Sequence, residues 1–183
     1  MLKIVAAPNE VFTTFTQPIE KIDQSIKKLV KEMEEVLTAQ TNPQGVGLAA
    51  PQIGIGLSFF IMKPTAKAKI TTFINPKILQ IEEKKSFTTR VRKDAKGKKK
   101  KNQLEGCLSI PRIWAPVKRS KKLLLEYQTV DSEKKREWFI GFKAVIIQHE
   151  VDHLNGILFT QRALEQKGQL YEEKEGKLQK LQY

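Results

Sequence analysis

Residues 142–154 read FKAVIIQHEVDHL and have the apolar pattern of a helix that is buried on more than one side. Asn155 and Gly156 follow as a typical C-terminal stop signal. The segment is more apolar than the other helical pattern of the chain, so we predict a helix in the core. Its apolar positions are Phe142, Val145, Ile146, Ile147, Val151 and Leu154.

Both histidines of the chain, His149 and His153, lie in this predicted helix. Residues four apart share one face of an α-helix, so both imidazoles can reach one metal ion. Glu150 lies beside them, where its carboxylate can contact a water on the metal. The segment therefore predicts a metal site on a core helix. The alternative interpretation is a pair of structural histidines beside a solvated glutamate.

A catalytic metal site usually has three protein ligands, so a third ligand must come from elsewhere in the chain. Cys107 is the candidate, because it lies in a glycine-containing turn, EGCLS at 105–109, and a thiolate binds soft or borderline divalent metals. A lone buried thiol is the alternative interpretation.

A glycine-rich segment, GVGLAAPQ at 45–52, supplies small residues that let the backbone approach a ligand closely. Its last residue, Gln52, offers an amide donor for an oxygen that develops negative charge. The segment has neither the Lys-Ser/Thr ending of a phosphate-binding loop nor the glycine spacing of a dinucleotide fingerprint. Nucleotide binding is therefore not indicated.

Taken together, GVGLAAPQ, EGCLS and QHEVDH (148–153), in this order, resemble the three signature motifs of the peptide deformylases. The resemblance covers most of residues 1–162 and includes DHLNGILF at 152–159. It implies an α+β fold, with antiparallel β-sheets around a central metal-binding helix. It also implies an activity: removal of the formyl group from the N-terminal formyl-methionine of newly synthesised polypeptides, with release of formate.

The same resemblance implies a metal site made of Cys107, His149 and His153. The metal is Fe(II) in most of the family, and Zn, Ni or Co can occupy such a site. Glu150 would accept a proton from the attacking water and return it to the leaving amine. For Asp152, a supporting role behind the ligands and a solvated position on the helix both stay open.

Two further roles follow from the resemblance. The Gln52 side-chain amide and the backbone N–H of Leu108 would stabilise the tetrahedral oxyanion. An apolar pocket would accept the methionine side chain, and the matching positions are Val46, Gly47, Leu108, Val145 and Ile146.

The rest of the chain predicts one amphipathic helix and several strands. Between Ile22 and Leu37 the apolar residues recur at helical spacing, and Asp23 or Ser25 can cap the start of this N-terminal helix. Runs rich in β-forming residues predict an antiparallel sheet. These runs are Leu57–Met62, Thr71–Ile74, Ile78–Ile81, Ile113–Val117 and Lys122–Val130.

Length and composition point to one globular domain. The chain has 183 residues, of which 40% are hydrophobic and 29% charged. We expect a catalytic domain over residues 1–165 and a peripheral polar tail over residues 166–183. No apolar run approaches the ~20 residues of a membrane helix, and no export signal is visible. A single cysteine forms no intrachain disulfide, which indicates a reducing compartment such as the cytoplasm. The resemblance implies a compartment in which translation takes place, either the cytoplasm or an organelle.

The net charge of +13 is concentrated in one segment. Residues 84–101 contain ten basic residues and one acid, and they resemble an insertion into the hairpin before Glu105. A solvated loop is one interpretation, and a contact with ribosomal RNA is the other. We expect nascent formyl-methionyl polypeptides as partners, and neither DNA nor a membrane.

Two competing functions deserve a test. A zinc endopeptidase also carries His-Glu-x-x-His, and Glu172 or Glu173 lies at a suitable distance along the chain for a third ligand. This alternative leaves Cys107 and the glycine-rich segment without a role. A basic RNA-binding module would rest on residues 84–101 alone.

Overall fold

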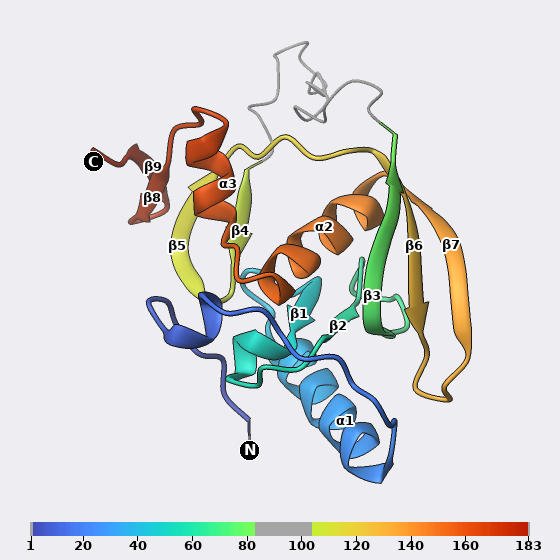
Figure 1. The fold of residues 1–183 in the computed structure, drawn as a ribbon. Helices are drawn as coiled ribbons and strands as arrows, with labels where there is room; N and C mark the ends of the chain where they lie inside the picture. The colour runs from blue at the N-terminus through green and yellow to red at the C-terminus, as the bar shows by residue number, and fades with distance from the viewer. Residues whose placement is uncertain (1, 83–103, 183) are drawn as a thin grey trace.

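The computed structural model describes residues 2–82 and 104–182 (Figure 1). In this part of the chain, helix α1 spans Gln24–Ala39, α2 spans Phe142–Leu154 and α3 spans Phe159–Glu165. Two short 3-10 helices, η1 at Glu10–Phe12 and η2 at Ala50–Ile53, accompany them. Helices α1 and α2 confirm the two helices predicted from the apolar patterns.

The strands of the described residues form two antiparallel sheets. The five-stranded sheet has the order β1-β2-β3-β6-β7, and the four-stranded sheet has the order β4-β5-β8-β9. The first sheet contains β1 Gly47–Ala49, β2 Phe59–Met62, β3 Thr71–Ile81, β6 Lys122–Gln128 and β7 Lys134–Ile140. The second contains β4 Glu105–Cys107, β5 Ile110–Ala115, β8 Tyr171–Lys174 and β9 Lys177–Lys180.

Helix α2 lies between β4 and β5 on one side and the strands β3, β6 and β7 on the other (Figure 1). Helix α1 contacts the same short strands, β1 and β2, that α2 contacts. The two helices cover opposite faces of these strands, because alternate residues of a strand point to opposite sides. Phe59 and Ile61 belong to the apolar cluster of α1, whereas Phe60 and Met62 belong to the cluster of α2.

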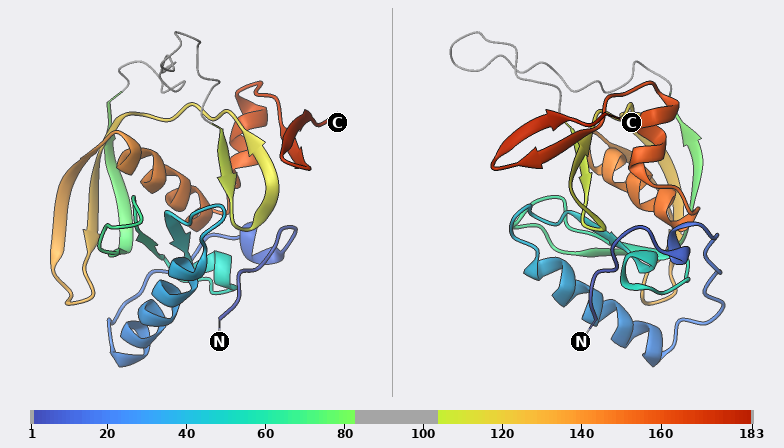
Figure 2. Two further views of the ribbon diagram at one scale, coloured as in Figure 1. Left: turned by 180° about the vertical axis from the view of Figure 1, so that it is seen from behind. Right: turned by 90° about the vertical axis from the view of Figure 1, so that its left-hand side faces the viewer.

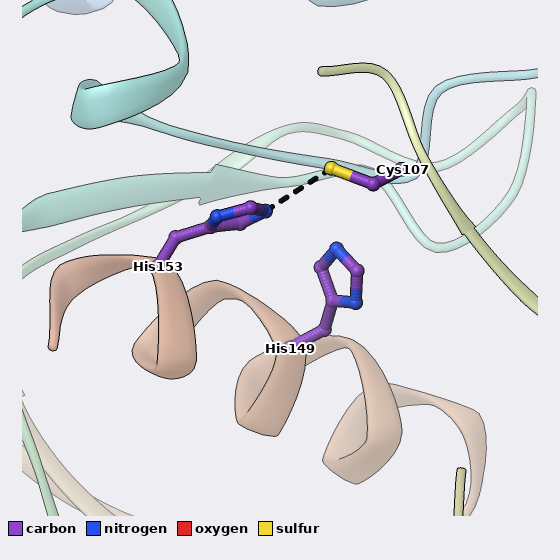
Figure 3. A group of neighbouring side chains, drawn as sticks. All are labelled: Cys107, His149 and His153. Atoms are coloured by element: carbon purple, nitrogen blue, oxygen red, sulfur yellow. Dashed lines mark hydrogen bonds between the residues drawn. The ribbon is translucent and has the colours of Figure 1, made fainter. Parts of the chain in front are cut away.

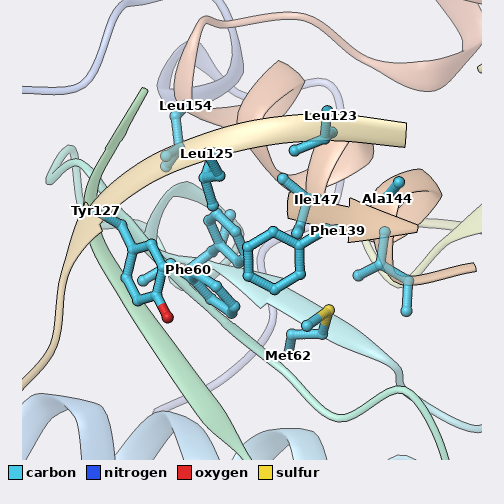
Figure 4. Close-up of a cluster of buried hydrophobic side chains, with 12 residues drawn as sticks. Phe60, Met62, Leu123, Leu125, Tyr127, Phe139, Ala144, Ile147 and Leu154 are labelled. Carbon is cyan, nitrogen blue, oxygen red and sulfur yellow. The ribbon is translucent and has the colours of Figure 1, made fainter. Parts of the chain in front are cut away.

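The cluster between α2 and the large sheet is rich in aromatic rings (Figure 4). Phe73 lies at its centre, with ring centroids 4.6 Å from Phe60, 4.7 Å from Tyr127 and 5.7 Å from Phe139. Each such ring buries a large apolar area, and each ring pair adds about 0.5–1.5 kcal/mol. Ile147 of α2 packs into this cluster. The helix that carries both histidines is therefore packed against the large sheet through this aromatic cluster.

Helix α1 begins where its sequence signals place it. The Asp23 carboxylate accepts hydrogen bonds from the backbone N–H groups of Ser25 at 2.9 Å and Ile26 at 3.2 Å, so Asp23 is the N-cap. The stripe of Val30, Met33 and Leu37 is buried.

The predicted strands are confirmed in part. The runs Thr71–Ile74 and Ile78–Ile81 form a single strand, β3, although Pro76 lies between them. Asn75 has a φ of 50°, and its side-chain amide exchanges two hydrogen bonds of 2.8 Å with the backbone of Ile19. These bonds tie the irregular point of β3 to the N-terminal segment, so the strand continues past the proline.

Several elements were not predicted from the sequence. Strand β7 was missed because its sequence, KKREWFI, is mostly charged and has few apolar positions. Strands β1 and β4 have only three residues each, and α3 has seven. The glycine-rich segment and the residue after it contain β1 and η2. Such short elements depend on their tertiary partners rather than on local propensity.

The predicted polar tail contains a β-hairpin. Strand β8 pairs with β5, where Trp114 lies opposite Tyr171, and β9 pairs with β8. Figure 2 shows this hairpin and α1 at opposite ends of the molecule. The tail therefore extends the second sheet. Within the described residues, no helix has the length and apolarity required to cross a bilayer.

Candidate metal centre and active site

Three side chains from distant parts of the chain converge beside α2. His149 and His153 lie one turn apart on this helix, and Cys107 ends strand β4 across from them (Figure 3). One ligand atom from each of the three lies within 4.8 Å of the other two. The Cys107 Sγ atom is 3.2 Å from Nε2 of His153. The structure thus brings together the three residues that the sequence pointed to as metal ligands.

The donor set fits a divalent transition metal. One sulfur and two imidazole nitrogens suit a soft or borderline cation. The Nδ1 atom of His153 is buried and has no hydrogen-bond partner in the described structure. Glu150 is also buried beside the three ligands, and a divalent cation would offset the cost of burying negative charge there.

Glu150 lies on α2 with its side chain inside the protein, 3% exposed. Its Oε2 atom has no hydrogen-bond partner among the described residues, and burial raises the pKa of its carboxyl group to about 7. A Cβ atom at Gly47 would collide with this carboxylate, so only glycine lets β1 approach α2 here. A carboxyl group with a pKa near neutrality can both accept and return a proton.

Gln52 is held in one orientation by its own backbone neighbourhood. The backbone N–H of Ala49 donates to its Oε1 atom at 2.8 Å. The Nε2 group therefore faces the site, where it donates to Cys107 Sγ at 3.3 Å and to Ser109 Oγ at 3.5 Å. A fixed amide donor beside the three ligands is the arrangement that oxyanion stabilisation requires.

A chain of ion pairs begins at the Nδ1 atom of the His149 ring. Its Nδ1 lies 3.2 Å from Oε2 of Glu105, and Arg119 donates to both oxygens of Glu105 at 2.9 and 3.0 Å. Arg119 also donates to Asp152 at 2.5 Å, and Arg162 binds the same carboxylate at 2.8 Å. Burial tends to raise the pKa of Glu105, but the His149 hydrogen bond and the Arg119 charge outweigh it and lower the pKa to about 2.

This chain of ion pairs settles the position of Asp152, which is 7% exposed. The solvated interpretation of Asp152 is therefore wrong. Arg119 and Arg162 were not identified from the sequence, because no local pattern relates them to the histidines.

Two aromatic rings lie beside the histidines. The ring of Phe159 stacks on that of His149 with centroids 6.0 Å apart, and the ring centroid of Phe12 lies 5.9 Å from that of His153.

A cavity of about 250 Å³ opens beside Cys107, His149 and Glu150. Every residue predicted for the methionine pocket lines it, namely Val46, Gly47, Leu108, Val145 and Ile146. Phe142 and Trp114 also line it and were missed. Phe142 could have been found, because it lies three and four residues before Val145 and Ile146 and so shares their face of α2. Trp114 could not, because its approach to the cavity depends on the pairing of β4 with β5.

The endopeptidase alternative is not supported. Glu173 lies on β8, where its Oε2 atom accepts a hydrogen bond from Trp114 at 2.9 Å. Glu172 forms an ion pair with Lys174 at 2.9 Å. Within residues 2–82 and 104–182, the group of side chains that could hold a metal ion consists of Cys107, His149 and His153. It includes neither glutamate.

Comparison with known proteins points to one family. The family model described as polypeptide deformylase matches residues 1–169. A peptide deformylase of Pseudothermotoga lettingae is 34% identical, over 86% of this chain and 80% of that protein, and one of Borreliella burgdorferi is 35% identical, over 86% and 85%. The crystal structure of a peptide deformylase from Thermotoga maritima matches with a TM-score of 0.74 and 34% identity, over 88% of this chain and 97% of the other.

A second solved structure, a peptide deformylase from Legionella pneumophila, matches with a TM-score of 0.74 and 29% identity, over 88% of this chain and 85% of that one. These matches confirm the expected α+β fold with antiparallel sheets around a central helix. The sequence motifs, the fold and the relatives all agree, and the chain belongs to the peptide deformylase family.

Proposed function

We propose that this chain hydrolyses the formyl amide of N-terminal formyl-methionine on newly synthesised polypeptides and releases formate. One observation carries the proposal: the thiol of Cys107 and the imidazoles of His149 and His153 meet at one point, with the Glu150 carboxyl group beside them. The family relationship supports the same reaction.

Cys107, His149 and His153 would hold the metal ion. We propose Fe(II), as in most of the family, with Zn, Ni or Co as alternative occupants of the same residues. When bound, such an ion supplies a Lewis acid that polarises the formyl oxygen and makes a bound water more acidic. One thiolate and two imidazoles support a borderline transition metal.

Glu150 moves the proton in this proposal. Its carboxylate takes a proton from the attacking water, while the water oxygen bonds to the formyl carbon. Glu150 then gives that proton to the amine nitrogen as the C–N bond breaks, which yields formate and a free N-terminus. The position of the carboxyl group supports both steps, because it is buried beside Cys107, His149 and His153 and its Oε2 atom has no hydrogen-bond partner among the described residues.

Two donors would stabilise the oxyanion that forms on the formyl oxygen. The Nε2 group of Gln52, already oriented by Ala49, is one of them. The backbone N–H of Leu108, directly after β4, is the other. Loss of a single donor of this kind costs roughly 10²- to 10³-fold in rate.

The methionine side chain would occupy the apolar part of the cavity. Val145, Ile146 and Phe142 come from α2, and Val46, Gly47 and Leu108 come from the facing segments. Uncharged walls suit a thioether side chain, which gains from burial and needs few hydrogen bonds.

The test is an anaerobic formate-release assay on formyl-Met-Ala with wild type and Glu150→Gln, both loaded with Fe(II) or Ni(II). We expect the variant to keep its metal and to lose about 10²- to 10⁴-fold in kcat, because it cannot accept a proton. Formate release at the wild-type rate by Glu150→Gln would contradict the assigned role. Absence of formate from metal-loaded wild type would contradict the proposed function itself.

The proposed ribosome contact of residues 84–101 lies outside the described residues. Replacing Lys98, Lys99, Lys100 and Lys101 with serine is expected to weaken salt-sensitive ribosome binding and to leave cleavage of formyl-Met-Ala unchanged. Unchanged ribosome binding would refute the contact. We also propose a cytoplasmic or organellar compartment, because a single thiol that binds Fe(II) functions best in reducing surroundings.

A further inference from the structure

Trp114 is a wall of the substrate cavity with no role in the reaction described above. It lies on β5, and its six-membered ring packs against the backbone of Gly106 on the paired strand β4. A Cβ atom at Gly106 would lie only 2.8 Å from Cζ3 and 2.9 Å from Cε3 of this ring. Glycine at this position therefore lets the indole lie across β4, one residue away from Cys107.

The C-terminal hairpin holds this ring in place. Strand β8 pairs with β5, and the indole N–H of Trp114 donates to Oε2 of Glu173 at 2.9 Å. The neighbouring Glu172 is neutralised by Lys174, but Glu173 has no cationic group within ion-pair distance in the described part of the chain. The hairpin thus places beside an aromatic wall of the cavity a carboxylate that has no ion-pair partner among the described residues.

The charge of the cavity contrasts with that of the whole chain. The net charge is +13, yet no lysine or arginine is found among the described residues that line the cavity. Glu105 is neutralised by Arg119. The indole ring of Trp114 makes this wall of the cavity aromatic. The Glu173 carboxylate next to the ring gives the wall a negative potential.

We propose that Trp114 and Glu173 form a subsite for a cationic side chain of the substrate, on one of the two residues that follow the methionine. This inference rests on the proposed function. An extended peptide advances about 3.3 Å per residue, so a chain whose formyl group lies at Cys107 reaches the adjoining Trp114 within about two residues. A lysine or arginine gains from the indole ring and from the carboxylate, whereas an acidic side chain is repelled.

The test compares kcat/KM for formyl-Met-Lys-Ser, formyl-Met-Leu-Ser and formyl-Met-Glu-Ser, and for the same residues at the third position. At low ionic strength we expect wild type to prefer Lys over Glu about tenfold at one of the two positions, which corresponds to two weak interactions acting together. The preference should shrink as salt is added, because exposed charges are screened.

Single substitutions distinguish the contribution of Glu173 from that of Trp114. Glu173→Gln keeps an acceptor for the indole N–H and removes the charge, so we expect the Lys/Glu ratio to fall about threefold or more. The matched control is Glu172→Gln, which removes a carboxylate that Lys174 already neutralises and should leave the ratio unchanged. Trp114→Ala should also lower the Lys/Glu ratio, because the cationic side chain loses its contact with the indole ring.

Two outcomes would overturn the subsite. The first is a ratio of kcat/KM for the Lys and Glu peptides that is equal in wild type and in Glu173→Gln, while formyl-methioninamide still releases formate at the normal rate. The subsite is then wrong, and the proposed function remains supported. The second uses Trp138→Phe, which leaves Trp114 as the sole tryptophan: its emission should change on adding the product Met-Lys-Ser, and an unchanged emission contradicts the contact. If metal-loaded wild type releases no formate from any substrate, the subsite falls together with the function.

Discussion

The two sheets of this protein differ in how they are stabilised, and each supplies one part of the site. The five-stranded sheet is covered by α1 and α2 and contains the aromatic cluster around Phe73. The four-stranded sheet has a much smaller apolar cluster, formed by Ala115, Val117, Phe159 and Ala163, and its edge strand β9 is exposed. The histidines depend on the first sheet, whereas Cys107 and Glu105 belong to the second.

This difference shows how a metal site can join two unequal halves. The large sheet fixes α2 by apolar burial, which holds His149 and His153 in place. Polar contacts link the small sheet to α2, from Glu105 through Arg119 to Asp152. A metal ion that binds both sides would add to this link, because a ligand of the folded state stabilises that state.

The largest effect is expected from Cys107→Ala, which removes the one proposed metal ligand that the small sheet supplies. The two histidines alone should not retain the ion, so formate release should fall to background. Metal content by elemental analysis, together with the formate assay, checks this. Retention of metal and activity would show that the small sheet is dispensable for the site.

Arg119→Gln sharpens the comparison by breaking the polar link while leaving the ligands intact. It leaves Glu105 and Asp152 buried with too little positive charge, which should cost about 3–5 kcal/mol of unfolding free energy. Metal affinity should fall about 10- to 100-fold, because Glu105 orients His149. Urea unfolding and metal titration measure the two effects.

Arg162→Gln is the matched control for this prediction. The Arg162 side chain is 35% exposed against 6% for Arg119, and Arg162 contacts Asp152 but not Glu105. Its loss should cost clearly less stability and leave metal affinity close to that of wild type. Equal effects of both variants would contradict a specific link through Arg119.

A pair of core substitutions compares the two apolar clusters directly. Phe73→Ala should cost about 3–5 kcal/mol, because three aromatic rings lose their common partner. Phe159→Ala should cost less, since its cluster is smaller and can relax, but it should weaken metal binding by freeing the His149 ring. If Phe159→Ala lowers the free energy of unfolding in urea more than Phe73→Ala does, the stronger core lies in the small sheet.

The smallest effect concerns Tyr127 in the large sheet. Burial, with the Glu137 charge and hydrogen bond, raises the pKa of the Tyr127 hydroxyl to about 12, above its usual value of about 10. The neutral phenol is thus favoured in the folded state, so its contribution to stability is full below about pH 10 and is lost as the pH rises through 12. Tyr127→Phe should remove the phenolate absorbance that titrates near pH 12, and titration of every tyrosine near pH 10 would disprove the shift.

Sequence reasoning was most successful where the controlling interactions are local. The apolar periods predicted α1 and α2, and Asp23 was among the expected caps. It was least successful for strands made of polar or very short segments, such as β7, β4 and the β8–β9 hairpin. These strands exist because a neighbouring strand completes their backbone hydrogen bonds, and no pattern within the strand itself reports that neighbour.

The same division applies to the site. The sequence alone predicted that His149, Glu150 and His153 share one helix, because helical spacing is a local property. Cys107 and the glycine-rich segment were connected to them through the resemblance of their short motifs to one family. Only the tertiary structure showed that Arg119 joins Glu105 to Asp152, and that Glu173 holds Trp114 at the cavity. The reason is physical: these contacts join residues that only sheet pairing and the packing of α2 bring together.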